Sequence, residues 1–139
     1  MNLEKLTPFF SLFGDAVPQI CSVNFAQYNT IPKSMGLYAI FQTDRCVYVG
    51  EGNITERIKH HSNKAYENWH SSSGKRNSTT DTVGWRDLRS QEWFNPSEWT
   101  IEYFTENSCI NRTAYEGIMM KLFNPYANNE SFADRLCIK

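Results

Sequence analysis

Two short apolar segments, separated by a brief polar stretch, constrain the fold of this chain most strongly. Residues 36–41 (GLYAIF) and 46–50 (CVYVG) are rich in aromatic and aliphatic side chains, whereas residues 42–45 (QTDR) are polar. Apolar runs of this length with so short a connection are typical of a β-hairpin. We therefore expect two antiparallel strands joined by a tight turn.

The register of this hairpin can be inferred from its apolar pattern. A loop with an odd number of residues makes one face wholly apolar, through two cross-strand pairs: Leu37 with Val49, and Ala39 with Val47. No Asn-Gly or Asp-Gly pair demands a two-residue turn. The odd loop also places Tyr38 directly opposite Tyr48 on the other face, so the sequence predicts two adjacent phenols.

Helical signals follow the hairpin. Residues 53–56 (NITE) fit a capping box, and the next residues continue an apolar stripe at helical spacing: Ile54, Ile58, His61 and Ala65. Residues 85–93 predict a short helix, 99–104 a third strand, and 111–123 a helix that ends before Pro125. This order predicts one α+β domain over residues 1–139, a three-stranded antiparallel sheet flanked by helices.

Residues 1–35 precede the hairpin and form an N-terminal extension in this interpretation. Leu3, Leu6, Phe10 and Phe13 are spaced for one face of a helix, which Gly14 would end. We expect this extension either to cover the sheet or to mediate self-association.

Several short motifs occur in a fixed order from residue 36 to residue 128. They are Gly36-Leu37-Tyr38, Tyr48-Val49-Gly50, Arg57 with His61, Ala114-Tyr115-Glu116, and Pro125-Tyr126-Ala127-Asn128. Together they resemble the GIY-YIG nuclease family, and the resemblance covers most of the chain. It implies a divalent-metal-dependent endonuclease that hydrolyses phosphodiester bonds in DNA.

The resemblance also assigns a role to each candidate catalytic residue. Tyr38 would be the general base toward water, and Tyr48 would position it. Because an arginine and a metal ion favour a phenolate, we expect a lowered tyrosine pKa. Arg57 would contact phosphate oxygens, and His61, four residues later on the same helix, would hydrogen-bond to a tyrosine or relay its proton.

The metal site implied by the resemblance depends on a single carboxylate. Glu116 would bind one Mg²⁺ or Mn²⁺ ion per active site, with water and phosphate oxygens as the remaining ligands. Asn128 would orient the metal-site waters or the adjacent loop. We see one candidate carboxylate and no acid cluster near the motifs, which favours a one-metal mechanism.

Two of these assignments have an alternative within the sequence. His60 competes with His61 for the histidine role. Residues 113–116 (TAYE) also fit a capping box, in which Glu116 would only stabilise a helix start. If the helix begins at Asn111 or earlier, Glu116 lies inside it and this alternative fails.

The charge distribution bears on the expected substrate. The formal net charge is -1, but basic residues outnumber acidic ones from residue 57 to residue 89. We expect phosphate contacts there, from Lys59, Lys75, Arg76 and Arg86. DNA is the expected substrate and RNA the alternative. With no room for a separate recognition domain, specificity would come from inserted loops, a homodimer or a partner protein.

The remaining features predict the setting of the protein. No stretch is long enough to span a bilayer, so no membrane partner is expected. The four cysteines lack a Cys-x-x-Cys pair and suggest reduced thiols in a cytoplasmic protein. Two other functions remain open at this point: a nucleic-acid-binding module of the same fold that has lost catalysis, and an RNase or toxin nuclease.

Overall fold

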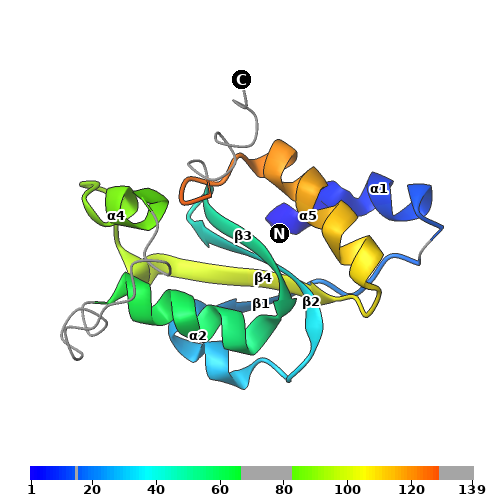
Figure 1. Cartoon of the computed structure of the whole chain (residues 1–139), viewed down its shortest axis with the longest axis horizontal. Helices are drawn as coiled ribbons and strands as arrows, with labels where there is room; N and C mark the ends of the chain where they lie inside the picture. The colour runs from blue at the N-terminus through cyan, green and yellow to red at the C-terminus, as the bar shows by residue number, and fades with distance from the viewer. Residues whose placement is uncertain (15, 67–82, 129–139) are drawn as a thin grey trace.

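A four-stranded antiparallel sheet forms the centre of the molecule, in a computed structural model that describes residues 1–14, 16–66 and 83–128 (Figure 1). The strand order is β1-β4-β2-β3. The strands are β1 (Cys21–Asn24), β2 (Met35–Gln42), β3 (Arg45–Asn53) and β4 (Trp99–Thr105). The expected α+β class is therefore correct, but the sheet has one strand more than the sequence predicts.

The additional strand is β1, which lies within the predicted N-terminal extension. It pairs with β4 from Cys21 opposite Tyr103 to Asn24 opposite Thr100. It has only four residues, and its side chains are alternately half-buried and exposed. Such a short, half-polar segment has no apolar run, so only its pairing with β4 identifies it as a strand.

Helices cover both faces of the sheet. One face carries η2 (Phe25–Thr30), α2 (Ile54–Ala65) and α4 (Val83–Arg89), and the other carries η1 (Asn2–Leu6), α1 (Thr7–Leu12) and α5 (Cys109–Phe123). The short η3 (Pro96–Glu98) precedes β4. None of the helices in the described ranges is long and apolar enough to cross a membrane.

The predicted hairpin is present, but its predicted register is wrong. Tyr38 lies opposite Gly50, and Tyr48 lies opposite Ile40. The loop has two residues rather than an odd number, because Gln42 pairs with Arg45. A β-bulge next to Ile40 supplies the extra residue that the apolar pattern places in the loop.

The bulge largely preserves the predicted division of the faces. Leu37, Ala39 and Val49 share one apolar cluster, as expected. Val47 was expected there too, but it packs in the cluster on the opposite face. A bulge and an odd loop both shift side chains by one position, and the apolar pattern cannot tell them apart.

The helix after the hairpin begins and faces as predicted. The side chain of Asn53 accepts a hydrogen bond from the Glu56 N–H, at 3.2 Å, which is the expected N-cap contact. Gly52 allows the chain to turn into the helix with a φ of +122°. The four residues of the predicted stripe are the buried residues of α2: Ile54, Ile58, His61 and Ala65.

Helix α5 begins earlier than the sequence predicts. Its N-cap is Ser108, whose side chain accepts a hydrogen bond from the Asn111 N–H at 3.1 Å. The helix ends at Phe123, and its C-cap is Asn124, which has a left-handed backbone with a φ of 47° and precedes Pro125. Glu116 therefore lies inside the helix, and the capping-box alternative for this residue fails.

The first residues of the chain are part of the folded core. Leu3, Leu6 and Phe10 are completely buried against the sheet face that α5 also covers. The buried carboxylate of Glu102 on β4 accepts hydrogen bonds from the Leu3 N–H at 2.8 Å and from the Asn2 side chain at 3.1 Å. Of its two expected roles, this segment therefore has the first, that of covering the sheet.

Candidate functional site

A glycine makes room for the first candidate tyrosine. Tyr38 on β2 is 1% exposed and lies opposite Gly50 of β3. A Cβ atom at position 50 would lie 2.3 Å from the Tyr38 Oη and 2.5 Å from its Cζ. Glycine at this position therefore allows the phenol to lie across the neighbouring strand.

The Tyr38 hydroxyl contacts His61, the histidine that lies one helical turn after Arg57 on α2. Its Oη lies 2.7 Å from Nε2 of His61, a buried residue of α2. The adjacent His60 is exposed on the same helix. The structure therefore selects His61 over His60 as the residue that contacts the tyrosine pair.

Tyr48 completes an aromatic cluster around this hydrogen bond. Its ring lies 6.2 Å from that of Tyr38, with the planes 17° apart, and 4.2 Å from the imidazole of His61. The indole of Trp85 on α4 also stacks on His61, with the ring centroids 5.3 Å apart and the ring planes 15° apart. The bulged register thus brings the two phenols together diagonally rather than directly across the hairpin.

Burial determines the protonation states within this cluster. Burial raises the pKa of Tyr38 well above 10, and it also raises the pKa of Tyr48. Burial lowers the pKa of His61 well below 6.5, with the positive charges of Lys64 and Arg57 acting in the same direction. Arg57 lowers both tyrosine pKa values, as expected, but burial outweighs it in the chain without a metal ion, which contains a neutral phenol beside a neutral imidazole. The further lowering expected from a bound metal ion stays a prediction.

Two side chains of opposite charge act on both phenols. Arg57 of α2 lowers the pKa of Tyr38 and of Tyr48, as expected, whereas Glu116 of α5 raises both. Arg57 is exposed, and its Nε donates to the Glu51 carbonyl oxygen at 3.3 Å.

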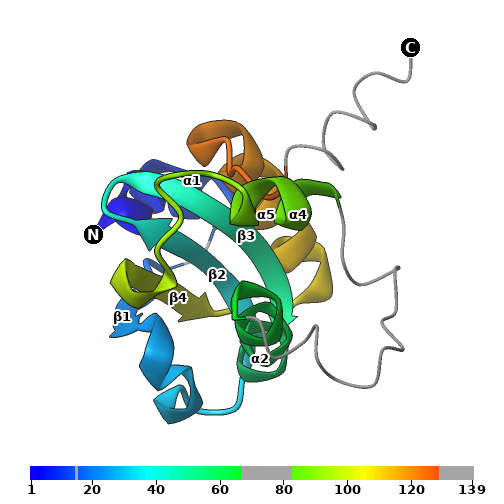
Figure 2. The same ribbon diagram turned by 90° about the vertical axis from the view of Figure 1, so that its left-hand side faces the viewer.

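Helices on opposite faces of the sheet supply these two charges. Strand β3 lies at the edge of the sheet, between α2 and α5 (Figure 2). Residues far apart in the sequence therefore influence the same pair of hydroxyl groups.

A second carboxylate lies in the site region, contrary to our expectation of only one. The negative charge of Glu51 on β3 also raises the pKa of Tyr38. Its Oε1 accepts a hydrogen bond from the Arg112 Nε at 2.9 Å, and the two residues form a salt bridge. Arg112 is buried and also donates to the carbonyl oxygens of Glu106 and Asn107. This ion pair joins α5 to β3 next to the candidate site.

Asn128 joins the segment after α5 to the edge strand. Its Oδ1 accepts from the Val49 N–H at 2.9 Å, and its Nδ2 donates to the Val49 carbonyl oxygen at 3.1 Å. The Ala127 N–H donates to the Val47 carbonyl oxygen at 2.8 Å. A hydrogen bond from Asn128 also lowers the pKa of Tyr48. Of the two roles expected for Asn128, the backbone contacts support the orientation of the loop. Its hydrogen bond to Tyr48 is a further contact that we did not predict.

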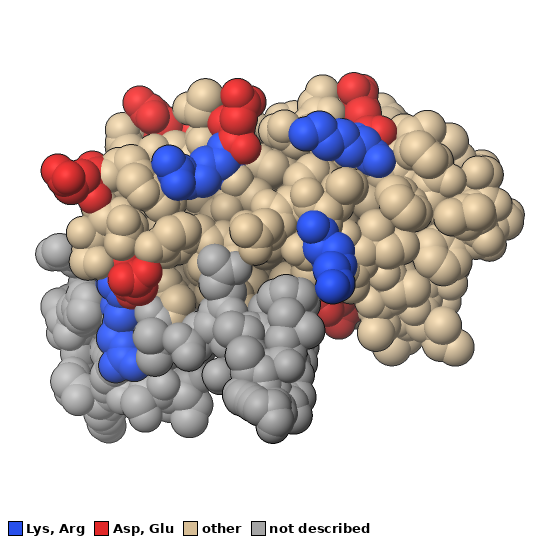
Figure 3. All heavy atoms as spheres, turned by 90° about the horizontal axis from the view of Figure 1, so that it is seen from above, with Lys and Arg blue, Asp and Glu red and all other residues tan. Residues whose placement is uncertain are grey.

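The structure describes two of the four residues that we expect to contact phosphate. Lys59 on α2 and Arg86 on α4 are exposed, whereas Lys75 and Arg76 lie outside the described residues. On the face seen in Figure 3, basic and acidic side chains are interspersed among uncharged surface. The visible charge of the described part of the chain is therefore mixed rather than strongly basic.

The donor set can be compared with the requirements of a metal ion. Across residues 1–14, 16–66 and 83–128, no three His, Cys, Asp or Glu side chains gather in one group. A Mg²⁺ ion bound through one carboxylate takes its other ligands from water and substrate phosphate. Glu116 is half-buried, and its charge reaches both phenols, so it fits such a site.

Comparisons of the chain with protein-family models, curated proteins and solved structures give no match. The local geometry therefore carries the functional interpretation. Two residues that contact or act on the candidate site were not predicted from the sequence. Glu51 directly follows the Tyr48-Val49-Gly50 motif and could have been noticed there, whereas nothing in the sequence indicates that Trp85 stacks on His61.

Proposed function

We propose that this chain is a divalent-metal-dependent endonuclease that hydrolyses phosphodiester bonds in DNA. The observation that carries this proposal is the hydrogen bond between Tyr38 and His61, with Tyr48 beside it and the charges of Arg57 and Glu116 acting on both phenols. Phosphodiester hydrolysis requires an activated water, a cation for the phosphate and help for the leaving oxygen. This small group of residues offers a chemical candidate for each requirement.

The neutral pair of Tyr38 and His61 supports a proton relay. As the Tyr38 oxygen accepts a proton from the attacking water, its own proton passes to Nε2 of His61, 2.7 Å away. The relay exchanges a buried phenolate at Tyr38 for a buried imidazolium at His61, and burial disfavours both charged forms. The negative charge of the bound phosphate would stabilise the imidazolium. The Nδ1 atom of His61 is buried and makes no hydrogen bond within the described part of the chain, so Tyr38 is the partner that orients the imidazole.

The remaining residues bind the phosphate and the metal ion in this proposal. The exposed guanidinium of Arg57 contacts a phosphate oxygen. The hydrogen bond from its Nε to the Glu51 carbonyl oxygen orients the side chain for this contact. Glu116 holds the divalent ion, which when bound stabilises charge on the phosphate and the leaving oxygen. Asn128 fixes the backbone of Val49 beside Tyr48.

A nicking assay on supercoiled plasmid tests this proposal. With Mg²⁺ or Mn²⁺ the wild-type chain should convert the plasmid to the open-circular form, and EDTA should abolish the reaction. Glu116→Gln and Tyr38→Phe should each lower the rate by about a hundredfold or more, because each removes a group that acts on the reacting atoms. His60→Gln is the matched control, since His60 is exposed beside the buried His61, and it should cut at the wild-type rate.

One observation favours a second candidate function. Tyr38 is almost completely buried and keeps its proton in the chain by itself, as expected of a structural aromatic residue. The chain would then be a nucleic-acid-binding module of the same fold without catalysis. Binding of DNA without cleavage under any divalent ion would support this candidate and contradict the nuclease. Matched DNA and RNA substrates separate a DNase from an RNase.

A further inference from the structure

Helix α2 carries a second basic side chain beside the candidate site. Arg57, His61 and Lys64 follow one another at spacings of four and three residues, so they lie on one face of the helix. Lys59 lies on the opposite side from Arg57, because each residue advances about 100° around the axis. With a rise of about 1.5 Å per residue, Lys64 lies about 10 Å along the axis from Arg57. The two cations therefore lie on either side of the imidazole along α2.

Helix α4 holds the ammonium of Lys64 close to this face. The Lys64 Nζ lies 5.8 Å from the centroid of the Trp85 ring, within the range of a cation–π contact. The same indole stacks on His61. The Arg89 Nη1 also donates a hydrogen bond to the Lys64 carbonyl oxygen at 3.1 Å. Because Trp85 is only 1% exposed, its ring supports the lysine and is not available to stack on a nucleobase.

The charge of Lys64 reaches a reacting group of the proposed mechanism. It lowers the pKa of His61, and its effect is larger than that of Arg57. His60, which is exposed on the same helix, acts in the same direction. Three basic residues of α2 thus surround the imidazole, and such a concentration of positive charge attracts an anion.

We propose that Lys64 binds a second backbone phosphate of the substrate, on the same strand as the phosphate that Arg57 contacts. A lysine ammonium is a compact cation with three hydrogen-bond donors, which suits phosphate oxygens. A single phosphate group is too small to reach two cations about 10 Å apart along the helix, whereas successive phosphates of one strand can reach both. The strand would run along α2 from Arg57 toward α4. This inference rests on the proposed function, since both place a nucleic-acid strand at this site.

A phosphate bound to Lys64 would also assist the proton relay. In the chain by itself, Lys64 and Arg57 both disfavour the protonated imidazole of His61. An anion bound to each cation would offset these charges and raise the pKa of His61. Substrate binding would therefore prepare His61 to take the proton of Tyr38.

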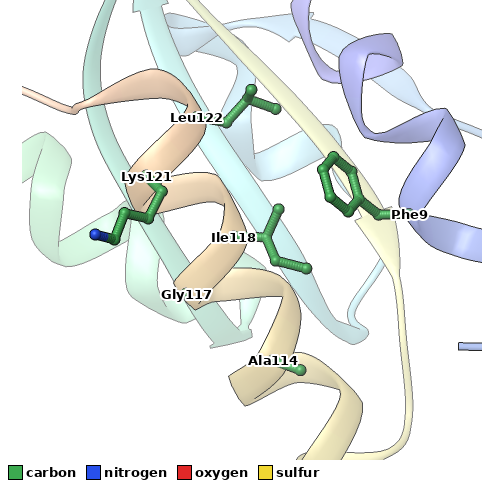
Figure 4. Close-up of a pocket in the computed structure, with 6 residues that line it drawn as sticks. All are labelled: Phe9, Ala114, Gly117, Ile118, Lys121 and Leu122. Atoms are coloured by element: carbon green, nitrogen blue, oxygen red, sulfur yellow. The ribbon is translucent and has the colours of Figure 1, made fainter. Parts of the chain in front are cut away.

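Lys121 provides a matched control on the opposite face of the sheet. It is exposed on α5, where it lines an apolar groove with Ile118 and Leu122 (Figure 4). It follows Glu116 by five residues, so the two side chains project from different sides of the helix. Lys121→Gln therefore removes the same charge as Lys64→Gln but leaves the basic side of α2 unchanged.

The salt dependence of DNA binding tests this proposal. The dissociation constant of the full chain for a short duplex is measured by fluorescence anisotropy over a range of salt concentrations, with EDTA present to prevent cleavage. Lys64→Gln should weaken binding roughly tenfold and lower the slope of log Kd against log salt concentration by about one, because one phosphate contact is lost. Lys121→Gln should keep the wild-type slope. A Lys64→Gln chain that is folded by circular dichroism and keeps the wild-type slope would overturn the proposal.

A methylphosphonate scan, in which single phosphates of one strand are made neutral, locates the two contacts. The wild type should bind more weakly when either of two phosphates of that strand is neutral. Lys64→Gln should lose its sensitivity at one of these positions, and Arg57→Gln at the other. A Lys64→Gln chain that stays sensitive at both positions would contradict the proposal.

Plasmid nicking separates this proposal from the nuclease function. If the wild type nicks plasmid and Lys64→Gln binds DNA like the wild type, the phosphate contact alone is overturned. If binding depends on Lys64 but the wild type never nicks, the nuclease alone is overturned and the phosphate contact stands. A wild-type chain that binds neither DNA nor RNA would overturn both.

Discussion

At the scale of single residues, the candidate site depends on close approaches that only particular side chains allow. Gly50 leaves room for the Tyr38 ring, and that ring reaches Nε2 of His61 at 2.7 Å. Trp85 and Tyr48 enclose the imidazole and keep water from it. Burial then holds the phenol and the imidazole neutral, the state that a proton relay requires before substrate binds.

The buried imidazole predicts a loss of stability in acid. The folded pKa of His61 lies well below 6.5, whereas an unfolded histidine titrates near 6.5. Below that pH the unfolded chain binds a proton that the folded chain does not, so the free energy of unfolding falls, by at most about 1.4 kcal/mol per pH unit. Above about pH 6.5, His61 is neutral in both the folded and the unfolded chain, so the full free energy of unfolding is retained.

Urea titrations at neutral pH and at mildly acidic pH measure this effect. His61→Gln should remove this part of the pH dependence, and His60→Gln, on the exposed side of α2, should retain it. Equal slopes for wild type and His61→Gln would show that His61 is not a buried neutral group.

At the scale of elements, the sequence predicted correctly those features that depend on one helix or strand alone. The stripe of α2 and its Asn53 cap were predicted residue by residue. The register of the hairpin was not, because a bulge satisfies the same apolar pattern as an odd loop. Strand β1 was missed because only its pairing with β4 defines it. Contacts between elements, such as Trp85 on His61, leave no local signal at all.

The N-terminal segment should be indispensable to the fold. Leu3, Leu6 and Phe10 are each fully buried, and losing one such side chain costs about 2–5 kcal/mol. Their combined loss is comparable with the whole stability of a domain, about 5–15 kcal/mol. Deletion of residues 1–14 should therefore abolish cooperative thermal unfolding, as followed by circular dichroism. A deleted chain that melts cooperatively near the wild-type temperature would contradict this burial.

At the scale of the whole molecule, the edge position of β3 brings the candidate residues together. Helices α2 and α5 pack on opposite faces of the sheet, yet Arg57 from one and Glu116 from the other act on the same two phenols. The salt bridge of Arg112 with Glu51 and the contacts of Asn128 with Val49 attach α5 and its following segment to this edge. The site is thus a property of the assembled fold.

A crystal structure of the chain with Mn²⁺ and a short DNA duplex would test the central claim most directly. We predict an anomalous peak for one ion bound by the Glu116 carboxylate, beside a phosphate that Arg57 contacts, with the Tyr38 and Tyr48 hydroxyls facing that phosphate. An ion bound elsewhere, or a phosphate far from Tyr38 and Arg57 with Glu116 pointing away, would contradict the account.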